Sequence, residues 1–394
     1  MGIHGLSKLI ADHAPGAMKE GKFENYFGRK IAIDASTSIY QFLVAVRHEE
    51  NALTNADGVV TSHLNGMFYR TVRMIDAGIK PVYVFDGKPP TMKGGELAKR
   101  HARAAQATAD LAKAKEEGNQ EDIEKFSKRT VRATKQQSLD CKKLLELMGV
   151  PVIDAPCEAE STCAALCAAG KVFAVGTEDM DALTFGSTVL LRHLTYSDTK
   201  KMPPMEYRLA DVLRLLELSM AQFIDVCILC GCDYTDKLKG VGPETALKKI
   251  REHGSLHALL HSTDKLVVGE DKVPASLREG YEEVQRLFTS PEAADPEAVE
   301  LRWGEPDVEG IVGFMCGEMG FDEKRIRSSC EKLVKAKGKG NQVRIENFFA
   351  AKPGTNPAAA PAGKAAAGSG KRKAEPAAKA GKGAAAAAGA KKKK

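Results

Sequence analysis

Seven carboxylates stand where predicted strands end or predicted helices begin. They are Asp34, Asp86, Glu158, Glu160, Asp179, Asp181 and Asp233. Any one of them could be a cap or turn residue, because first-turn carboxylates complement a helix dipole. Gathered in one cleft, however, they would raise one another's pKa and could not all stay ionised without positive charge between them. Their recurrence from element to element therefore indicates a site for metal ions.

The types of these residues select the metal and the chemistry. Hard oxygen ligands without an accompanying His or Cys pattern favour Mg²⁺ or Mn²⁺ over zinc or copper. So many ligands suit two ions, and two ions about 3.5–4 Å apart are the usual device for in-line displacement at phosphorus. The sequence has no GxxxxGK[ST] loop and no kinase signature, which argues against nucleotide-driven phosphoryl transfer. Phosphodiester hydrolysis remains.

The densest group of acids is EDMD at 178–181, directly after the apolar run KVFAVG. Asp179 and Asp181 are two residues apart, so an extended turn would aim both at one ion while Met180 points back to the core. Glu178 falls outside this pair, and we do not expect it to be a ligand.

An α/β fold is predicted to position the acids. Five short apolar runs have the composition of strands, at 29–36, 80–87, 149–155, 171–177 and 188–194. Amphipathic segments near 37–48, 62–77, 121–148 and 157–169 alternate with them, and further helices are expected over 290–337. Such alternation is typical of a mostly parallel central sheet flanked by helices. In that architecture, function gathers beyond the carboxyl ends of the strands.

Residues 88–135 break the alternation. A Pro-Pro, Gly-Gly linker precedes a long Ala-rich helix, on which Lys93 and Arg100 share a face if the helix begins early enough. A second helix is predicted to carry a basic stripe of Lys125, Lys128, Arg129, Arg132 and Lys135, with Ile123, Val131, Leu144 and Leu145 on an apolar side. Such helices are usually solvated, but a positive insertion directly after an acid-bearing strand could hold a phosphate backbone over the site.

Residues 223–250 have the pattern helix, glycine-rich turn, helix. In the hairpin 240–243, backbone N–H groups at a helix N-terminus can bind a DNA phosphate, although a plain tight turn needs glycine as well. Nearby, Cys227-x-x-Cys230-x-Cys232 resembles part of a zinc site, but no second Cys/His pair lies at finger spacing. We expect buried reduced thiols, since nine scattered cysteines do not suggest a disulfide framework either.

The charge is unevenly distributed. The chain of 394 residues has a net charge of +6, yet residues 351–394 alone carry eleven of the 58 basic residues and one acid, which leaves −4 for residues 1–350. The tail, rich in Ala, Gly, Pro and Lys, should be disordered, and its basic clusters fit nuclear import, phosphate contact or mere solubility.

No apolar run approaches a membrane span and no secretory signal is present, so we expect a soluble intracellular protein without a membrane partner.

Eight blocks of sequence resemble the eukaryotic flap endonucleases of the XPG-type structure-specific nuclease family. They are MGIHGLSKLIADHAP, IAIDASTSIYQFL, GMFYRTVRM, KPVYVFDGKPP, GELAKR, DAPCEAES, TEDMDALTFG and GCDYTDKLKGVGP. The resemblance covers roughly residues 1–350 and includes all seven acids. It implies a PIN-like nuclease core with a helical arch and a helix–two-turn–helix DNA-binding region.

The resemblance also implies a function. It is a structure-specific 5′-flap endonuclease with 5′→3′ exonuclease activity, which hydrolyses DNA flaps in Okazaki-fragment maturation and long-patch base excision repair. The expected enzyme is a monomer in the nucleus (nucleoplasm and nucleolus), with a mitochondrial fraction left open. Two other functions fit the sequence less well. A clamp-tethered DNA-binding scaffold would gain nothing from concentrated negative charge facing DNA, and a bubble- or junction-cutting paralogue is disfavoured by the short arch insertion and by a clamp-binding box.

Residue roles follow from the same resemblance. Asp34, Asp86, Glu158 and Glu160 would bind mainly one Mg²⁺, and Asp179, Asp181 and Asp233 mainly the other, with Mn²⁺ as a substitute. Catalytic roles fall to Lys93, Arg100 and Asp181. The implied DNA contacts are Gly2, Tyr40, Arg47, Arg70, Glu158, Gly231, Asp233, Lys239, Gly240 and Gly242. Tyr40 would stack on a base, and the hairpin would bind downstream duplex with a K⁺ ion.

The segment QVRIENFF at 342–349 matches the clamp-binding box of this family. Gln342 would fill a polar pocket, and Ile345, Phe348 and Phe349 would form an apolar plug. A short aromatic motif at a domain edge is more often a packing turn, but its place between the body and the tail favours a partner, the proliferating-cell nuclear antigen sliding clamp.

The sequence therefore divides into six predicted regions. They are a nuclease region with the start of the arch (1–105), the arch (106–121), an internal nuclease region with the hairpin (122–255), closing helices (256–340), the clamp-binding box (341–349) and a disordered basic tail (350–394).

Three positions depart from the family pattern. Glu244 replaces a common Lys or Arg, and Cys157 and Cys232 replace Ser.

Overall fold

The computed structural model describes residues 2–45, 58–194, 202–268 and 272–338. Residues 1–344 form one compact unit, and residues 345–394 form a second unit, which lies outside the described residues. Arg47, the clamp-binding box and the tail also fall outside them. The division into six regions therefore stays a prediction.

One seven-stranded sheet organises the body, in the order β1-β7-β6-β5-β2-β3-β4. Its strands are β1 (Met18–Glu20), β2 (Lys30–Asp34), β3 (Lys80–Phe85), β4 (Val152–Asp154), β5 (Ala174–Gly176), β6 (Val189–Arg192) and β7 (Met205–Arg208). The five strands from β6 to β4 run parallel, while β7 and β1 add an antiparallel edge. The five predicted strands and the mostly parallel sheet are confirmed. The two antiparallel strands, β1 and β7, were not predicted.

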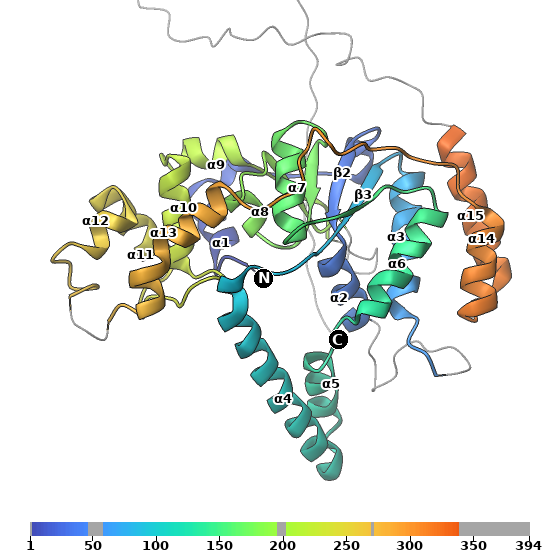
Figure 1. Ribbon diagram of the computed structural model, residues 1–394, viewed down its shortest axis with the longest axis horizontal. Helices are drawn as coiled ribbons and strands as arrows, with labels where there is room; N and C mark the ends of the chain where they lie inside the picture. The colour runs from blue at the N-terminus through green and yellow to red at the C-terminus, as the bar shows by residue number, and fades with distance from the viewer. Residues whose placement is uncertain (1, 46–57, 195–201, 269–271, 339–394) are drawn as a thin grey trace, which may run out of the picture. The chain divides into compact units, whose positions relative to one another are not determined.

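Helices cover both faces of the sheet (Figure 1). Along β2, Ile31 and Ile33 enter one hydrophobic cluster and Ala32 enters the other, as the alternation of side chains in a strand requires. The first cluster includes side chains of α2 (Ala35–Ala45), α3 (Ser62–Asp76), α6 (Lys135–Leu147), α14 (Val308–Val312) and α15 (Glu323–Gly338). The second includes side chains of α1 (Leu6–His13), α7 (Ala159–Ala168), α8 (Asp181–Thr184), α9 (Leu209–Leu215), α10 (Met220–Cys230), α11 (Pro243–His253), α12 (Leu256–Leu260) and α13 (Ala275–Thr289).

A helical hairpin extends from the body between β3 and α6 (Figure 1). The short helix η3 (Thr91–Lys93) leads into α4 (Gly94–Glu117), which packs on α5 (Gln120–Arg129). Gly118, with φ +67°, ends α4 in the left-handed conformation that favours glycine, and the Asn119 side chain caps α5. We call residues 91–129 the arch.

The single helix predicted over 121–148 is wrong. It is two helices, because Thr134 and Gln137 form a capping box that starts α6 afresh. The predicted basic stripe is therefore divided: Lys125, Lys128 and Arg129 lie on α5, Arg132 in the connection and Lys135 on α6. The four residues assigned to the apolar side, Ile123, Val131, Leu144 and Leu145, are all buried.

The helices expected over 290–337 begin only at Val308. Residues 290–307 instead form an irregular crossover from α13, on one face of the sheet, to α14, on the other (Figure 1). Trp303 anchors it by donating its indole N–H to the Pro81 carbonyl at 3.0 Å, and the Gly304 amide donates to Gly149.

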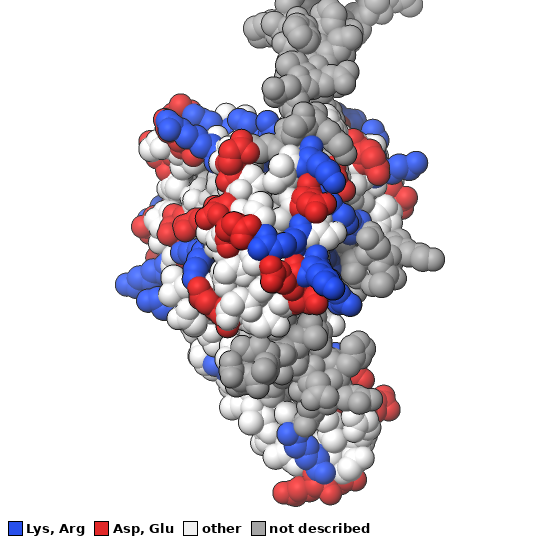
Figure 2. Space-filling view, turned by 90° about the vertical axis from the view of Figure 1, so that its right-hand side faces the viewer, with Lys and Arg blue, Asp and Glu red and all other residues white. Residues whose placement is uncertain are grey.

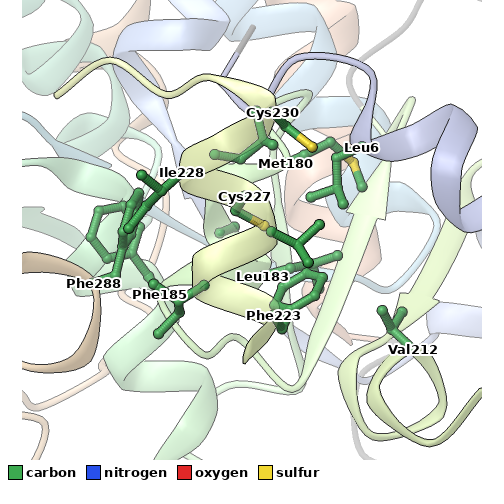
Figure 3. Close-up of a cluster of buried hydrophobic side chains, with 14 of the residues drawn as sticks. Leu6, Met180, Leu183, Phe185, Val212, Phe223, Cys227, Ile228, Cys230 and Phe288 are labelled. Carbon is green, nitrogen blue, oxygen red and sulfur yellow. The ribbon is translucent and has the colours of Figure 1, made fainter. Parts of the chain in front are cut away.

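The cysteines lie in the core rather than at a metal site. Cys227 and Cys230 on α10 point among Leu6, Met180 and Phe223 (Figure 3). All nine thiols are free, and burial raises the pKa of Cys230 to about 12. Among the described residues, no group of side chains placed to hold a metal contains a cysteine. These observations support the buried-thiol prediction over zinc.

Acidic and basic side chains are interspersed on the face of the molecule in Figure 2. This mixture agrees with the small net charge of residues 1–350. None of the helices in the described ranges combines the length and the apolar character needed to span a membrane.

Candidate active site

Three acids meet at the carboxyl edge of the sheet. Glu160 on α7, and Asp179 and Asp181 after β5, offer carboxylate oxygens that all lie within 4.8 Å of one another. All three side chains are buried, and Asp181 Oδ1 has no hydrogen-bond partner among the described residues. A buried, unpartnered carboxylate oxygen is costly unless a cation balances it. The three acids therefore fit a metal ion.

The EDMD segment folds as a helix start rather than as the predicted extended turn. Met180 has φ −80° and ψ −11°, and the Asp181 amide donates to Asp179 Oδ1 at 3.2 Å. Met180 is buried in the core, as expected. Glu178 turns elsewhere: it accepts from the His193 amide at 2.6 Å and lies 3.4 Å from Arg192.

Asp34 and Asp86 join the group from β2 and from the end of β3. Each also accepts a backbone hydrogen bond: Asp34 from the nearby Thr37 amide at 3.0 Å, and Asp86 from the Ala159 amide at the start of α7 at 2.7 Å. Both acids therefore bind a backbone amide at the start of a helix, as a cap does, and both also belong to the acidic group. Burial, Asp86 and Asp179 together raise the pKa of Asp34 to about 7.

Like charge and burial act on the other acids in the same way. Burial, followed by the charges of Asp179 and Asp181, raises the pKa of Glu160 well above its ordinary value. Burial, Asp179 and Asp233 do the same for Asp181, against a smaller lowering by Lys93. The site is thus short of positive charge, the condition under which hard cations bind carboxylates.

The remaining two acids, Glu158 and Asp233, form ion pairs with cations of the arch. Lys93 Nζ contacts Glu158 Oε1 and lies 3.4 Å from Asp233 Oδ2, and Arg100 Nη2 donates to the same Asp233 oxygen at 2.6 Å. Burial alone would lower the pKa of Lys93, but Glu158, Glu160 and Asp233 raise it, so it stays a cation. The helix does not begin early enough to include Lys93, because α4 starts at Gly94, yet both cations still contact one carboxylate.

The chain N-terminus closes one side of the acidic group. A Cβ atom added to Gly2 would lie 1.6 Å from Asp179 Oδ1 and 2.1 Å from Asp181 Oδ1, and its φ is +71°. Only glycine fits there. The same segment then contacts the loop after α10, where the His4 amide donates to the Gly231 carbonyl at 3.2 Å.

The other predicted DNA contacts lie at two separate places. Tyr40, on α2, is half exposed, and Arg70, on α3, lies over the Phe42 ring. Lys239, Gly240 and Gly242 lie in the hairpin before α11, which Gly242 caps. Arg47 is among the residues that the structure does not describe.

Some contacts at the site had no signal in the sequence. Tyr234 donates its hydroxyl to Glu158 Oε2, and Lys99 on the arch pairs with Asp236. Tyr234 lies next to Asp233, but nothing in its type indicated that it would reach another acid. Only the fold brings these side chains together.

A second cluster resembles a metal site but is already neutralised. Glu252, His253 and Asp264 approach one another at the end of α11. Lys249 Nζ lies 2.6 Å from Glu252 and 2.7 Å from Asp264, so its charge supplies what a cation would.

Comparison with known proteins agrees with this site. The models "XPG N-terminal domain" and "XPG I-region" match residues 1–107 and 149–233. "Flap endonuclease 1" of Danio rerio is 57% identical over 349 residues, 89% of this chain and 90% of its own length. The protein of the same name from Nematostella vectensis is 55% identical over 90% of this chain and 92% of its own. The chain belongs to the flap endonuclease family.

Solved structures extend the match to the fold. The flap endonuclease-1 from Methanococcus jannaschii is 29% identical with a TM-score of 0.65, over 84% of this chain and 98% of its own. The catalytic core of Rad2 in complex with a DNA substrate is 28% identical with a TM-score of 0.65, over 85% of this chain and all of its own. As a family member, this flap endonuclease is a structure-specific nuclease, and the blocks quoted from the sequence identified the family.

Proposed function

We propose that the protein cleaves 5′ flaps one nucleotide into the downstream duplex, with accompanying 5′→3′ exonuclease action, by two-metal hydrolysis of the phosphodiester. The observation that carries this proposal is the buried group Glu160, Asp179 and Asp181, with its unpartnered oxygen, facing the arch cations Lys93 and Arg100. Concentrated negative charge beside fixed positive charge suits a metal-assisted attack on a phosphate, and it does not suit DNA binding alone.

The seven acids would hold two Mg²⁺ ions, or Mn²⁺ in their place. When bound, the ions supply an activated hydroxide and stabilise charge on the attacking and leaving oxygens. Lys93 and Arg100 are placed to bind the scissile phosphate where negative charge develops. Gly2 keeps the N-terminal segment close to the carboxylates, and Tyr40 would stack on a base beside the cleavage point.

The hairpin before α11 would bind the downstream duplex through backbone N–H groups, with a K⁺ ion. Such contacts read the shape of the DNA rather than its sequence. In the cell we place the protein as a monomer in the nucleus. There it would trim flaps in Okazaki-fragment maturation and in long-patch base excision repair, tethered to the proliferating-cell nuclear antigen clamp.

A panel of DNA substrates tests the proposed function. The protein is incubated with 5′-flap, bubble, four-way-junction and single-stranded DNA of matched sequence, in Mg²⁺ and in EDTA. We expect fast cleavage of the 5′ flap alone, at one position, and only with Mg²⁺. Faster cleavage of the bubble or the junction would favour the paralogue interpretation. Binding without cleavage of any substrate would favour the scaffold.

Removal of metal should change stability in a pH-dependent way. In the folded protein the pKa of Asp34 is raised to about 7, and the pKa values of Glu160 and Asp181 are raised well above their ordinary values. Each group therefore stabilises the fold while it is protonated, and this contribution is lost as pH rises from the ordinary carboxyl pKa of about 4 through the raised pKa. Mg²⁺ binds the ionised forms. The rise in Tm on adding Mg²⁺ should therefore be larger at pH 7.5 than at pH 5.5, by about 3 °C or more. Equal rises at both pH values, against an Na⁺ control of matched ionic strength, would contradict this.

Glu244 provides a prediction specific to this chain. It lies in the first turn of α11, beside the hairpin, and pairs with His13 at 2.7 Å. A carboxylate there repels a phosphate at the helix N-terminus. We expect Glu244→Lys to tighten duplex binding about three- to tenfold and to steepen its salt dependence by about one ion. The control is Glu331→Lys on α15, which makes the same charge change on the other face of the sheet. An equal gain in duplex affinity for this variant would show that only the net charge of the protein matters.

The clamp-binding box is tested by Phe348→Ala with Phe349→Ala. The plug of Ile345, Phe348 and Phe349, with Gln342 beside it, is predicted to anchor the clamp but to take no part in hydrolysis. We expect the double variant to lose stimulation of cleavage by the clamp while basal cleavage survives. Equal loss of both activities would mean that the motif is a packing turn of this protein.

A further inference from the structure

The base of the arch is tied to the body by three cations. Lys93 contacts Glu158 and Asp233, Arg100 contacts Asp233, and Lys99 pairs with Asp236. All three partners lie at the carboxyl edge of the sheet or in the loop after α10. These contacts hold η3 and the first two turns of α4 against the body, and with them Lys93 and Arg100.

Two of the three ties end on carboxylates that the proposed function also assigns to metal ions. Glu158 and Asp233 cannot hold the arch cations and coordinate metal ions with the same oxygens. In the loaded enzyme, Lys93 and Arg100 would instead face the phosphate. Their hold on the body therefore depends on what occupies the site.

The contact between Lys99 and Asp236 does not depend on whether metal ions or DNA occupy the site. Asp236 is outside the seven acids, and α13 fixes it: the Asp236 amide donates to Ser276 Oγ at 3.3 Å, and that hydroxyl donates to Asp236 Oδ2 at 2.9 Å. The hydrogen bonds from Lys99 and Ser276 lower the pKa of Asp236, so it is ionised at neutral pH. Both side chains are about half exposed. The pair therefore forms at the surface rather than among the buried acids.

We propose that Lys99 and Asp236 are a positioning pair, which keeps the base of the arch in register when metal ions and DNA take over Glu158 and Asp233. Lys99 immediately precedes Arg100, and Asp236 follows Asp233 by three residues, so the pair sets the register between the two segments that carry catalytic groups. Neither side chain touches the reacting atoms. The inference rests on the proposed function of the site.

Amide hydrogen exchange of residues 94–103, without DNA, separates this role from a general structural one. The protein, Asp236→Asn, Asp236→Glu and the control Lys113→Gln are compared in EDTA and in Mg²⁺. Among the residues that the structure describes, Lys113 forms its ion pair within α4, with Glu117 at 3.7 Å. We expect Asp236→Asn to match the wild type in EDTA, where Lys93 and Arg100 hold the arch, and to exchange about two- to fivefold faster in Mg²⁺, the range of an exposed pair. Asp236→Glu and Lys113→Gln should match the wild type in both.

Cleavage provides the second measurement. In single turnover on a 5′ flap, Asp236→Asn should lower the maximal rate about two- to fivefold with unchanged DNA affinity, and Lys99→Asp with Asp236→Lys should restore it. Exchange that is unchanged in Mg²⁺, or equally faster in EDTA and in Mg²⁺, would overturn the proposal. Failure of the proposed function is distinguishable, because a wild-type protein that cleaves no flap would leave the exchange result intact.

Discussion

Asp181→Ala is expected to lower the rate of flap cleavage in saturating Mg²⁺ by about a thousandfold or more, the scale expected when a metal-assisted step is lost. Asp181 is the most buried of the three grouped acids, at 2% exposure, and no residue in the described part of the chain forms a hydrogen bond with its Oδ1. The substitution removes the oxygen that most needs a cation. Single-turnover cleavage of a 5′ flap measures the effect.

The same substitution should raise the Tm of the metal-free protein. In the wild type, Asp181 is buried beside Asp179 with its pKa well above the ordinary value, so ionising it near neutral pH costs free energy. Removal of a strained functional group commonly stabilises a fold while it abolishes activity. A fall in both Tm and activity would show that Asp181 is structural.

Asp154→Ala is the matched control. Asp154 also ends a strand, β4, but its side chain is 70% exposed and pairs with Lys142. We expect cleavage within about twofold of the wild type, since surface substitutions of this kind have small effects. A loss comparable to that of Asp181→Ala would mean that strand-end acids act through folding rather than through metal.

Lys93→Ala and Arg100→Ala are expected to have the second largest effect, a fall of about 10²- to 10³-fold each in the single-turnover rate. Both cations lie against Asp233, at the point where the arch meets the acids. Positive charge fixed there stabilises the negative charge that develops on the phosphate, so the rate should fall while the affinity for flap DNA changes little.

Mg²⁺ binding by Lys93→Ala, measured without DNA, should be no weaker than in the wild type. Lys93 pairs with Glu158 in the metal-free protein, and its removal frees that carboxylate.

Lys113→Ala, farther along the arch, is the control for the cleavage rates and should cleave as the wild type does. Loss of DNA affinity in parallel with the rate would contradict a transition-state role for Lys93 and Arg100.

The sequence predicted the parallel core because those strands are apolar, buried runs bounded by turns. It did not reveal β1 and β7, the two antiparallel strands at one end of the sheet, which are short and carry exposed polar residues such as Lys19 and Arg208. The break between α5 and α6 was also missed, because the capping box of Thr134 and Gln137 lies within an otherwise continuous helical pattern.

For the site, the sequence supplied residue types and their order along the chain but not their partners. Acids at strand ends could be expected to converge, because parallel strands end at one edge of the sheet. That Lys93 reaches Glu158, 65 residues away, depends on how α4 leaves the body. The pairing of Lys99 with Asp236 across 137 residues had no local signature at all.

A Mg²⁺ titration of single-turnover cleavage on a 5′ flap, with the wild type and Asp181→Ala in parallel, tests the claim that two metal ions bound by the acids carry out the hydrolysis. The two-metal site predicts no product in EDTA, a rate that rises with about the second power of Mg²⁺ concentration before saturating, and product one nucleotide into the duplex. It predicts almost no product from Asp181→Ala at any concentration. Cleavage that persists in EDTA, or that is undiminished in the variant, would contradict the claim.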